Sequence, residues 1–273
     1  MFTPDAFLRA FHGRHPGCTT AAYARGRAPD GRSSYEILAD LVPPAATVLD
    51  LGCGDGHLLE LLARAPARTL IGVDLSDAEL AAARRRPALA RAVLLGGDAA
   101  ALPVADASID ACVSHLAFTL MTDPVAVAAE VARVLRPGGV FATVVGGSPA
   151  ADHPGEAFDA FLALAAPRLP RASTTPRLGD PRVRHAAGLD TILGPAGFAP
   201  VVFERVVIDL GGTVDEVWAT LSTLYELAPL SPAELAALRR ELDALAVTLA
   251  DQRGRVACAI AVGVAVARRH IAP

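Results

Sequence analysis

The feature that most constrains the fold is a regular alternation of short apolar runs with helical segments between residues 46 and 147. The pattern predicts strands at 47–51, 69–73, 93–95, 109–114 and 140–145, with helices at 56–65, 77–86 and 124–135. Strands separated by helices are joined by crossovers, which place the strands parallel in one sheet. Such crossovers are right-handed. The sequence therefore predicts an α/β domain built on a parallel sheet.

The segments on either side of this alternation differ in character. Residues 1–42 mix an apolar helical pattern with helix-breaking Pro and Gly, and we expect an irregular N-terminal lid. Residues 148–187 are rich in Pro, Arg and Ala, and we expect an insertion with one helix and no sheet element. Residues 188–273 return to the first pattern, with strands at 201–210 and 256–268 and helices at 189–193, 214–225 and 232–250. We therefore divide the chain into a lid at 1–42 and a domain at 43–273, with cap insertions at about 148–187 and 213–250.

The composition and charge of the chain indicate which kinds of partner and cellular setting to expect. The chain of 273 residues is 52% hydrophobic and 20% charged, enough apolar content for an ordered core. Its net charge of −4 carries no block of like charges, whereas a broad nucleic-acid surface needs clustered cations. The four cysteines are scattered, as is typical of reduced thiols. The most apolar stretch, 256–267, is too short to cross a bilayer. We expect a cytoplasmic monomer or homodimer with no nucleic-acid or membrane partner.

A glycine-rich run, Val-Leu-Asp-Leu-Gly-Cys-Gly-Asp-Gly at 48–56, follows the first expected strand and opens a helix. Glycine is needed where the backbone approaches a ligand closely, and the helix that follows directs free N–H groups towards it. The spacing Gly52-x-Gly54-x-Gly56 differs from the dinucleotide fingerprint, and the chain has no Lys for a phosphate-binding P-loop. By itself the run is also compatible with a plain strand–helix turn.

Two acidic residues follow the neighbouring strands. Asp74 ends the second strand, where a carboxylate can accept hydrogen bonds from both ribose hydroxyls of a nucleoside. Asp98 follows the third strand and can accept one from an adenine amino group. In parallel sheets, ligands bind at the carboxyl ends of the strands, so these side chains and the glycine run are expected at one edge.

Four stretches occur in order: VLDLGCGDG (48–56), GVDLS (72–76), GDAAALPVADASIDACVS (97–114) and ARVLRPGGVF (132–141). In these stretches the chain resembles the class I S-adenosylmethionine (SAM)-dependent methyltransferases, in the ubiquinone-methyltransferase-like (methyltransferase type 11) branch. The resemblance implies a Rossmann-like fold with a seven-stranded, mostly parallel sheet. Helices cover both of its faces, the last strand is antiparallel, and helical lids are added.

The resemblance also implies a cofactor site for SAM, with S-adenosylhomocysteine as product. By resemblance, Asp50, Gly52 and Gly54 surround the methionine part, and we place Cys53 of the same loop with them. Asp74 binds ribose and Leu75 packs on adenine. The remaining implied residues are Asp98 and Ala99 at the adenine edge and Ser114 near the methionine part.

Two residues are candidates for chemistry on the acceptor. His115 follows the fourth strand, and its ordinary pKa suits proton removal at neutral pH, so we expect it to be the general base. Tyr23, in the lid, is the second candidate and is predicted to pair with His115. The alternatives are a strand-end hydrogen bond for His115 and simple packing for Tyr23. His12, His15 and Cys18 are spaced like metal ligands, but Pro and Gly interrupt the helix and no second ligand cluster stands out, so we expect no metal.

The spacing of Trp218, Leu221, Leu224 and Tyr225 predicts one helical stripe, which either belongs to the core or lines an acceptor pocket. Taken together, these features favour methyl transfer from SAM to a small, largely apolar metabolite. The chain resembles bacterial specialised-metabolite enzymes, so C- or O-methylation of an aromatic or indole-like natural product is favoured. The alternatives are a SAM-binding cyclase (pericyclase) of the same fold that does not methylate, and an RNA or protein methyltransferase.

Overall fold

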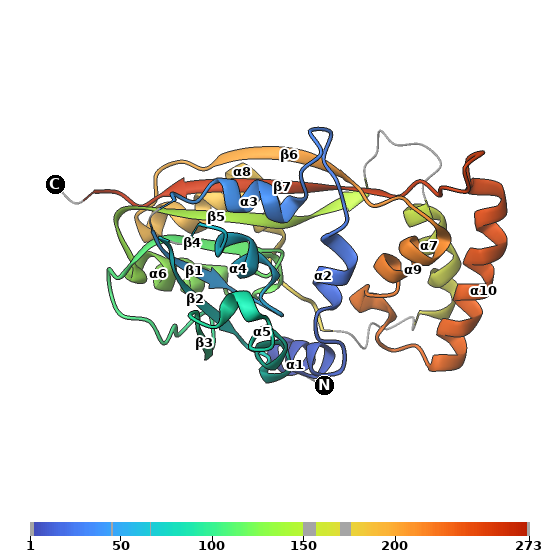
Figure 1. Ribbon diagram of the computed structural model, residues 1–273, viewed down its shortest axis with the longest axis horizontal. Coiled ribbons are helices and arrows are strands. Elements are labelled where there is room, and N and C mark those ends of the chain that lie inside the picture. Colours follow the sequence, from blue (N-terminus) through green and yellow to red (C-terminus); the bar gives the residue numbers. More distant parts are fainter. Residues whose placement is uncertain (1–2, 45, 66, 150–156, 170–175, 272–273) are drawn as a thin grey trace.

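Seven strands form a single sheet in the computed structural model, which describes residues 3–44, 46–65, 67–149, 157–169 and 176–271 (Figure 1). The order of the strands is β3-β2-β1-β4-β5-β7-β6. Their bounds are Thr47–Leu51 (β1), Thr69–Asp74 (β2), Val93–Gly96 (β3), Ile109–His115 (β4), Leu135–Pro149 (β5), Val202–Asp209 (β6) and Ala259–Arg268 (β7).

The pairing of the strands explains where the site lies. Strands β1 to β5 are parallel, with Asp50 opposite Gly72 of β2 and Val113 of β4. Strand β7 is antiparallel to both β5 and β6. The predicted seven-stranded sheet with an antiparallel last strand is confirmed. The strand order reverses on the two sides of β1, and such a point is where α/β folds bind ligands.

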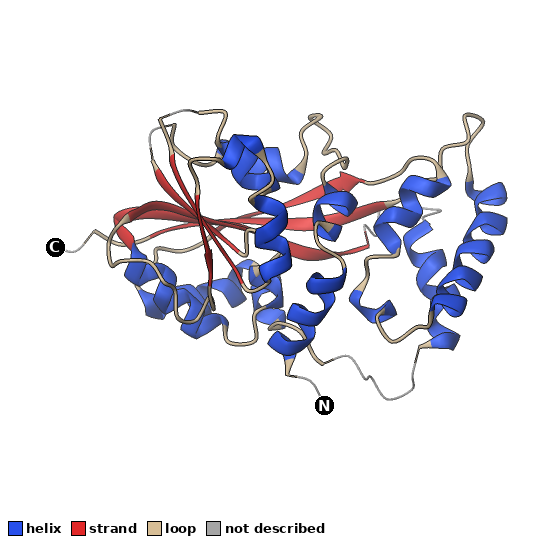
Figure 2. Ribbon diagram, turned by 60° about the horizontal axis from the view of Figure 1, so that its bottom comes forward, coloured by secondary structure: helices blue, strands red, loops and turns tan. Residues whose placement is uncertain are grey.

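Helices cover both faces of the sheet (Figure 2). On one face, α3 (Ser34–Asp40), α4 (His57–Leu62) and α5 (Asp77–Ala83) contribute to one hydrophobic cluster. On the other, α6 (Pro124–Val134) and α8 (Ala186–Leu193) contribute to a second. Strand β1 lies between them, since Val48 belongs to the first cluster and Leu49 to the second. This alternation follows from the twofold period of side chains along a strand.

The lid and the cap meet beyond the sheet. The N-terminal segment forms α1 (Pro4–Arg14) and α2 (Cys18–Tyr23), and the cap comprises α7 (Ala157–Ala165), α9 (Val214–Leu221) and α10 (Pro232–Leu249). In Figure 1, α2 lies between the sheet and the cap helices. The start of α10 is a capping box, in which Ser231 and Glu234 each accept a hydrogen bond from the other's backbone.

The predicted helical stripe of the cap is divided by the end of α9 at Leu221. Leu221 is fully buried in the cap core, and Trp218 packs edge-on against Phe161 of α7. Leu224 and Tyr225 lie beyond the helix, and both line the cavity described below. The stripe is therefore divided between packing in the core and the wall of a cavity.

One boundary prediction was wrong. Strand β5 continues through 148–149, where Ser148 and Pro149 pair with β7, so the expected insertion begins inside the sheet. The long antiparallel partner β7 makes this extension possible, and β7 lies far away in the sequence. Of the insertion, 150–156 and 170–175 lie outside the described residues. Within the described part of the chain, no helix is both long and apolar enough to cross a bilayer.

Candidate active site

The glycine run forms the turn between β1 and α4, as predicted. Gly52, Gly54 and Gly56 all have positive φ (73°, 51° and 82°), a conformation that L-residues adopt only at a cost. Gly52 also has no room for a side chain, because a Cβ there would lie 2.3 Å from the Cβ of Ala117. The Gly54 N–H donates to Asp74 Oδ2 at 2.7 Å, which ties the loop to the end of β2.

Asp50, the last acidic residue before the loop, is an unpaired buried carboxyl. It is 1% exposed, and neither of its oxygens has a hydrogen-bond partner among the described residues. Burial, followed by the nearby carboxylates of Asp74 and Asp55, raises the pKa of Asp50 well above its ordinary value. A buried carboxyl of this kind is expensive unless a cation or a donor is supplied. Asp50 also lines the larger of the two cavities described next, and its carboxyl therefore fits a cationic ligand.

Two adjoining cavities lie over the carboxyl ends of the strands. The larger has a volume of about 260 Å³ and the smaller about 120 Å³. Asp50, Gly52, Cys53 and Gly54 line the larger one. The two cavities adjoin, and both are lined by His12, Gly52, Asp74, Ala117 and Leu120.

The smaller cavity collects the residues expected at an adenine and its ribose. Leu75, Asp98 and Ala99 line it, together with Asp74. Asp74 accepts hydrogen bonds from Gly54 N–H and, at 2.8 Å, from Ser76 N–H. Burial raises the pKa of Asp74, although these two hydrogen bonds oppose the shift. The geometry therefore brings together the predicted nucleoside-binding residues.

Ser114 is placed differently from its expected role. It is fully buried and lines neither cavity among the residues described. Its hydroxyl donates to Leu51 O at 2.8 Å and accepts from Phe118 N–H at 3.2 Å. Ser114 thus fastens the end of β4 to β1 and to the turn that follows.

His115 lines the larger cavity but is buried, with 6% of its surface exposed. Its Nε2 lies 2.9 Å from the hydroxyl of Ser34, and its Nδ1 has no partner among the described residues. The ring stacks on Tyr35 with centroids 3.5 Å apart. Burial, with a smaller contribution from His57, lowers the pKa of His115 to about 3. The imidazole is therefore neutral at physiological pH.

Tyr23 also lines the larger cavity, and burial raises its pKa to about 12. The aromatic partner of His115 is Tyr35, and no contact between His115 and Tyr23 is recorded in the described structure. Tyr35 is both buried and part of the cavity wall.

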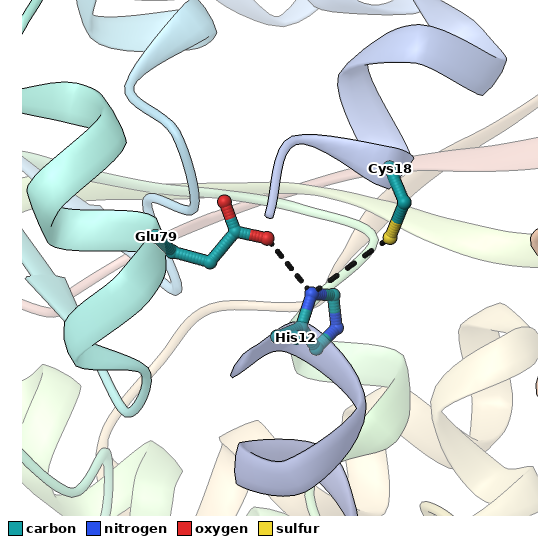
Figure 3. A group of neighbouring side chains, drawn as sticks. All are labelled: His12, Cys18 and Glu79. Carbon is teal, nitrogen blue, oxygen red and sulfur yellow. Dashed lines mark hydrogen bonds and ion pairs between the residues drawn. The ribbon is translucent and has the colours of Figure 1, made fainter. Parts of the chain in front are cut away.

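One cluster at the cavity was identified only in part from the sequence, which named His12 and Cys18 but not Glu79 (Figure 3). His12 Nδ1 lies 2.9 Å from Glu79 Oε1, and Cys18 Sγ lies 3.9 Å from the same nitrogen. His12 Nε2 lies 3.0 Å from the hydroxyl of Tyr225. Burial opposes the shift, but hydrogen bonds to Cys18 and Glu79 raise the pKa of His12 to about 10.

Glu79 was not predicted as part of this cluster, because its spacing from Ser76 predicts a helix cap. Ser76-x-x-Glu79 has the form of a capping box, in which the Glu side chain returns to the N-cap residue. Ser76 does cap α5, but the Glu79 carboxylate points to the lid and accepts from Gly17 N–H at 2.9 Å. Local spacing cannot distinguish these two directions.

Comparison with known proteins agrees with this arrangement. Residues 49–143 match the family described as the methyltransferase domain, and this segment covers the glycine loop, Asp74, Asp98 and His115. Residues 49–143 of the chain thus match a methyltransferase domain. Its fold is that of the class I methyltransferases, as predicted.

Two curated relatives share this domain. One is a malonyl-[acyl-carrier protein] O-methyltransferase of Pectobacterium atrosepticum, 39% identical over 151 residues, which are 54% of this chain and 56% of the relative. The other is a trans-aconitate 2-methyltransferase of Variovorax paradoxus, 38% identical over 124 residues, which are 45% of this chain and 47% of the relative. The chain thus spans about half the length of these relatives.

Solved structures resemble the whole chain. The [4+2]-cyclase SpnF has a TM-score of 0.61 and 19% identity, covering 99% of this chain and 97% of SpnF. A geranyl diphosphate methyltransferase in complex with SAM has a TM-score of 0.50 and 18% identity, covering 86% and 84%. At these identities the likeness shows the fold alone.

Proposed function

We propose that this protein transfers the methyl group of SAM to a small-molecule acceptor bound in the larger cavity. The observation that carries the proposal is the buried, unpaired carboxyl of Asp50 beside a glycine loop of a methyltransferase domain. SAM carries a sulfonium and an ammonium group, the kind of cation that this carboxyl lacks. The names of the curated relatives, both methyltransferases, support the same activity.

The residues present fit SAM along the two cavities. Asp50 and the backbone of the glycine loop would hold the methionine part, and Asp74 would accept from the ribose hydroxyls. Leu75, Asp98 and Ala99 would enclose the adenine in the smaller cavity. Bound in this way, SAM supplies an activated methyl group whose loss leaves S-adenosylhomocysteine.

The low pKa of His115 supports one class of acceptor group over others. A phenol, an alcohol or an indole must lose a proton during methyl transfer, and a base is most effective when its pKa lies near the working pH. A histidine with a pKa of about 3 is a poor base at neutral pH. A carboxylate is already ionised at this pH and needs no base. We therefore propose that the acceptor is a carboxylate oxygen.

Two further observations support a carboxylate. The relatives named for malonyl-[acyl-carrier protein] and trans-aconitate act on molecules that carry carboxyl groups. Arg184 lines the larger cavity, and no hydrogen bond or ion pair to it is recorded among the described residues. A guanidinium binds a carboxylate through two parallel hydrogen bonds. Arg184 is exposed at the cavity wall, so it would orient the acceptor with little desolvation cost.

The second candidate is the reaction expected from the sequence, C- or O-methylation of an aromatic or indole-like ring. It is favoured by the unpartnered Nδ1 of His115, which is available to accept a hydrogen bond from an acceptor O–H or N–H. In this version His115 acts as the base with Tyr23. The third candidate, a cyclase that binds SAM without methylating, is favoured by the full-length likeness to SpnF.

A comparison of acceptors tests the proposal. The protein is incubated with SAM and a panel of carboxylic acids, phenols and indoles, and S-adenosylhomocysteine is quantified. We expect methyl ester formation from a carboxylic acid, with turnover retained in His115→Gln. Turnover of phenols or indoles alone, lost in His115→Gln, would favour the second candidate and refute the carboxylate.

The role of Arg184 has a matched control, Arg182, within the same short 3-10 helix, Pro181–Arg184. Arg184→Gln is expected to raise the KM for the acid about fivefold, corresponding to about 1 kcal/mol for an exposed ion pair. Arg182→Gln is the control, because Arg182 is exposed and already paired with Asp180. Equal effects of the two substitutions would remove Arg184 from the acceptor site.

A further inference from the structure

The cluster of His12, Cys18 and Glu79 joins three separate elements at the wall of the larger cavity (Figure 3). His12 is on α1, Cys18 begins α2, and Glu79 is on α5 of the methyltransferase domain. One ligand-type atom from each lies within 4.8 Å of the others. Figure 3 shows the carboxylate and the thiol both directed at Nδ1 of the imidazole.

The set of donor atoms is the one that zinc prefers. Zn²⁺ binds thiolate sulfur, imidazole nitrogen and carboxylate oxygen, at about 2.3 Å for sulfur and about 2.0–2.1 Å for nitrogen and oxygen. A tetrahedral ion then separates nitrogen from oxygen by roughly 3.3 Å and nitrogen from sulfur by roughly 3.6 Å. In the structure these separations are 2.9 Å and 3.9 Å. Shifts of a few tenths of an ångström would bring both contacts into range.

The surroundings of the cluster match a metal site beyond its three ligands. A ligating His normally engages its second ring nitrogen with a neighbouring polar group, which fixes the orientation of the ring. Here Nε2 of His12 lies 3.0 Å from the hydroxyl of Tyr225. The second oxygen of Glu79 is likewise held by Gly17 N–H at 2.9 Å, which leaves the oxygen that faces His12 for an ion.

The charge at the cluster also calls for a cation. The side chain of Glu79 is 3% exposed, and its one recorded ion-pair partner in the described structure is His12. Asp55, whose Oδ2 would be 3.3 Å from a Cβ on Gly17, is already paired with Arg86, so the carboxylate of Glu79 is the charge that remains to be balanced. A proton on His12 or a divalent ion can balance this charge, and the position of Cys18 favours the ion.

We propose that His12, Cys18 and Glu79 bind one Zn²⁺, with Tyr225 positioning His12 and the fourth coordination site open to the larger cavity. The ion replaces the proton on His12 Nδ1 and the proton of the Cys18 thiol, both of which pass to solvent. Because its ligands come from α1, α2 and α5, the ion pins the N-terminal lid to the methyltransferase domain. This site does not depend on the proposed methyl transfer.

Zinc content tests the proposal directly. The full chain is prepared with zinc present, dialysed without chelator and analysed by mass spectrometry for metal. We expect about one zinc per chain. Cys18→Ser and Glu79→Gln are expected to lower zinc affinity by at least 10-fold, while His15→Gln, an exposed neighbour outside the cluster, leaves it unchanged. Zinc well below one per chain, or one per chain that survives both ligand substitutions, would overturn the site.

Two further readouts separate ligation from folding. Replacement of zinc by Co²⁺ is expected to give a thiolate-to-cobalt absorption band in the wild type and in His15→Gln, but not in Cys18→Ser. Hydrogen exchange of residues 4–23 is expected to slow when zinc is added to metal-free wild type. The proposal would be contradicted by a cobalt band that persists in Cys18→Ser, or by hydrogen exchange of residues 4–23 that is unchanged when zinc is added.

Discussion

Asp50→Asn tests the buried carboxyl that carries the proposed cofactor site. The substitution keeps the shape of the side chain and mimics its protonated form, but it cannot become negative. In the wild type, the positive groups of SAM would stabilise ionised Asp50. Hydrogen bonds to charged groups contribute about 1.5–3 kcal/mol, so the variant should bind SAM about 10- to 150-fold more weakly at pH 8.

The pH dependence of SAM affinity is a second test of Asp50. Burial raises the pKa of Asp50 in the ligand-free protein, so SAM binding must remove a proton below that pKa. SAM affinity in the wild type should therefore fall as pH falls, by up to tenfold per pH unit for one released proton. The variant has no such proton to release. Isothermal titration calorimetry from pH 6 to 8 measures both slopes, and the titration of the ligand's own amino group is common to both proteins.

The stability of the ligand-free protein should depend on pH in the opposite direction to SAM affinity. A carboxyl whose pKa is raised on folding opposes the folded state above its unfolded pKa, by up to about 1.4 kcal/mol for each unit of the shift. Ligand-free wild type should therefore lose stability as pH rises towards the folded pKa of Asp50, and Asp50→Asn should not show this loss. Equal pH slopes for SAM binding, with dissociation constants within twofold of each other, would refute the assignment of Asp50.

Three further substitutions test the site and the cap, each with a control. Gly52→Ala should lower the free energy of unfolding by about 3 kcal/mol in denaturant titration, because of its positive φ and its contact with Ala117. The control is Gly13→Ala, which has open space around it and should be neutral or stabilising by up to about 1 kcal/mol. Asp74→Ala should weaken SAM binding at least 10-fold by calorimetry, while the exposed Asp77→Ala should not; equal affinities would contradict the ribose assignment. In the cap, Leu221→Ala should lower the free energy of unfolding by about 2–5 kcal/mol, because the side chain is fully buried. Val247, which is 82% exposed, is the control, and Val247→Ala should lower it by less than about 0.5 kcal/mol. A small loss of stability in Leu221→Ala would mean that the cap is not a packed unit.

Much of the sheet could be predicted because its signals are local. Each strand of the parallel part is a short apolar run with a turn or a helix on either side, and the strand at 47–51 is found with the predicted bounds. Asp74 and Asp98 were predictable for the same reason, since both directly follow strands whose carboxyl ends share one edge. The extension of β5 to Pro149 was not, because it depends on pairing with β7, more than a hundred residues away.

Beyond the residues predicted to bind the cofactor, the arrangement of the cavity depends on contacts between segments that are distant in the sequence. The sequence identified His115, but its low pKa comes from burial against Tyr35 and proximity to His57, neither of which its own sequence neighbours indicate. Glu79 has the spacing of a helix cap and instead faces the lid. The sequence placed His12 and Cys18 in a possible metal pattern with His15, and the structure replaces His15 with Glu79.

The central claim is methyl transfer from SAM to a small acceptor, and one mass measurement tests it most directly. The protein is incubated with SAM bearing a trideuterated methyl group and with the carboxylic acid that gives the highest turnover in the panel. The account predicts a product heavier by one trideuterated methyl group and an equal amount of S-adenosylhomocysteine. An acceptor that is rearranged without change of mass, with SAM recovered intact, would contradict it.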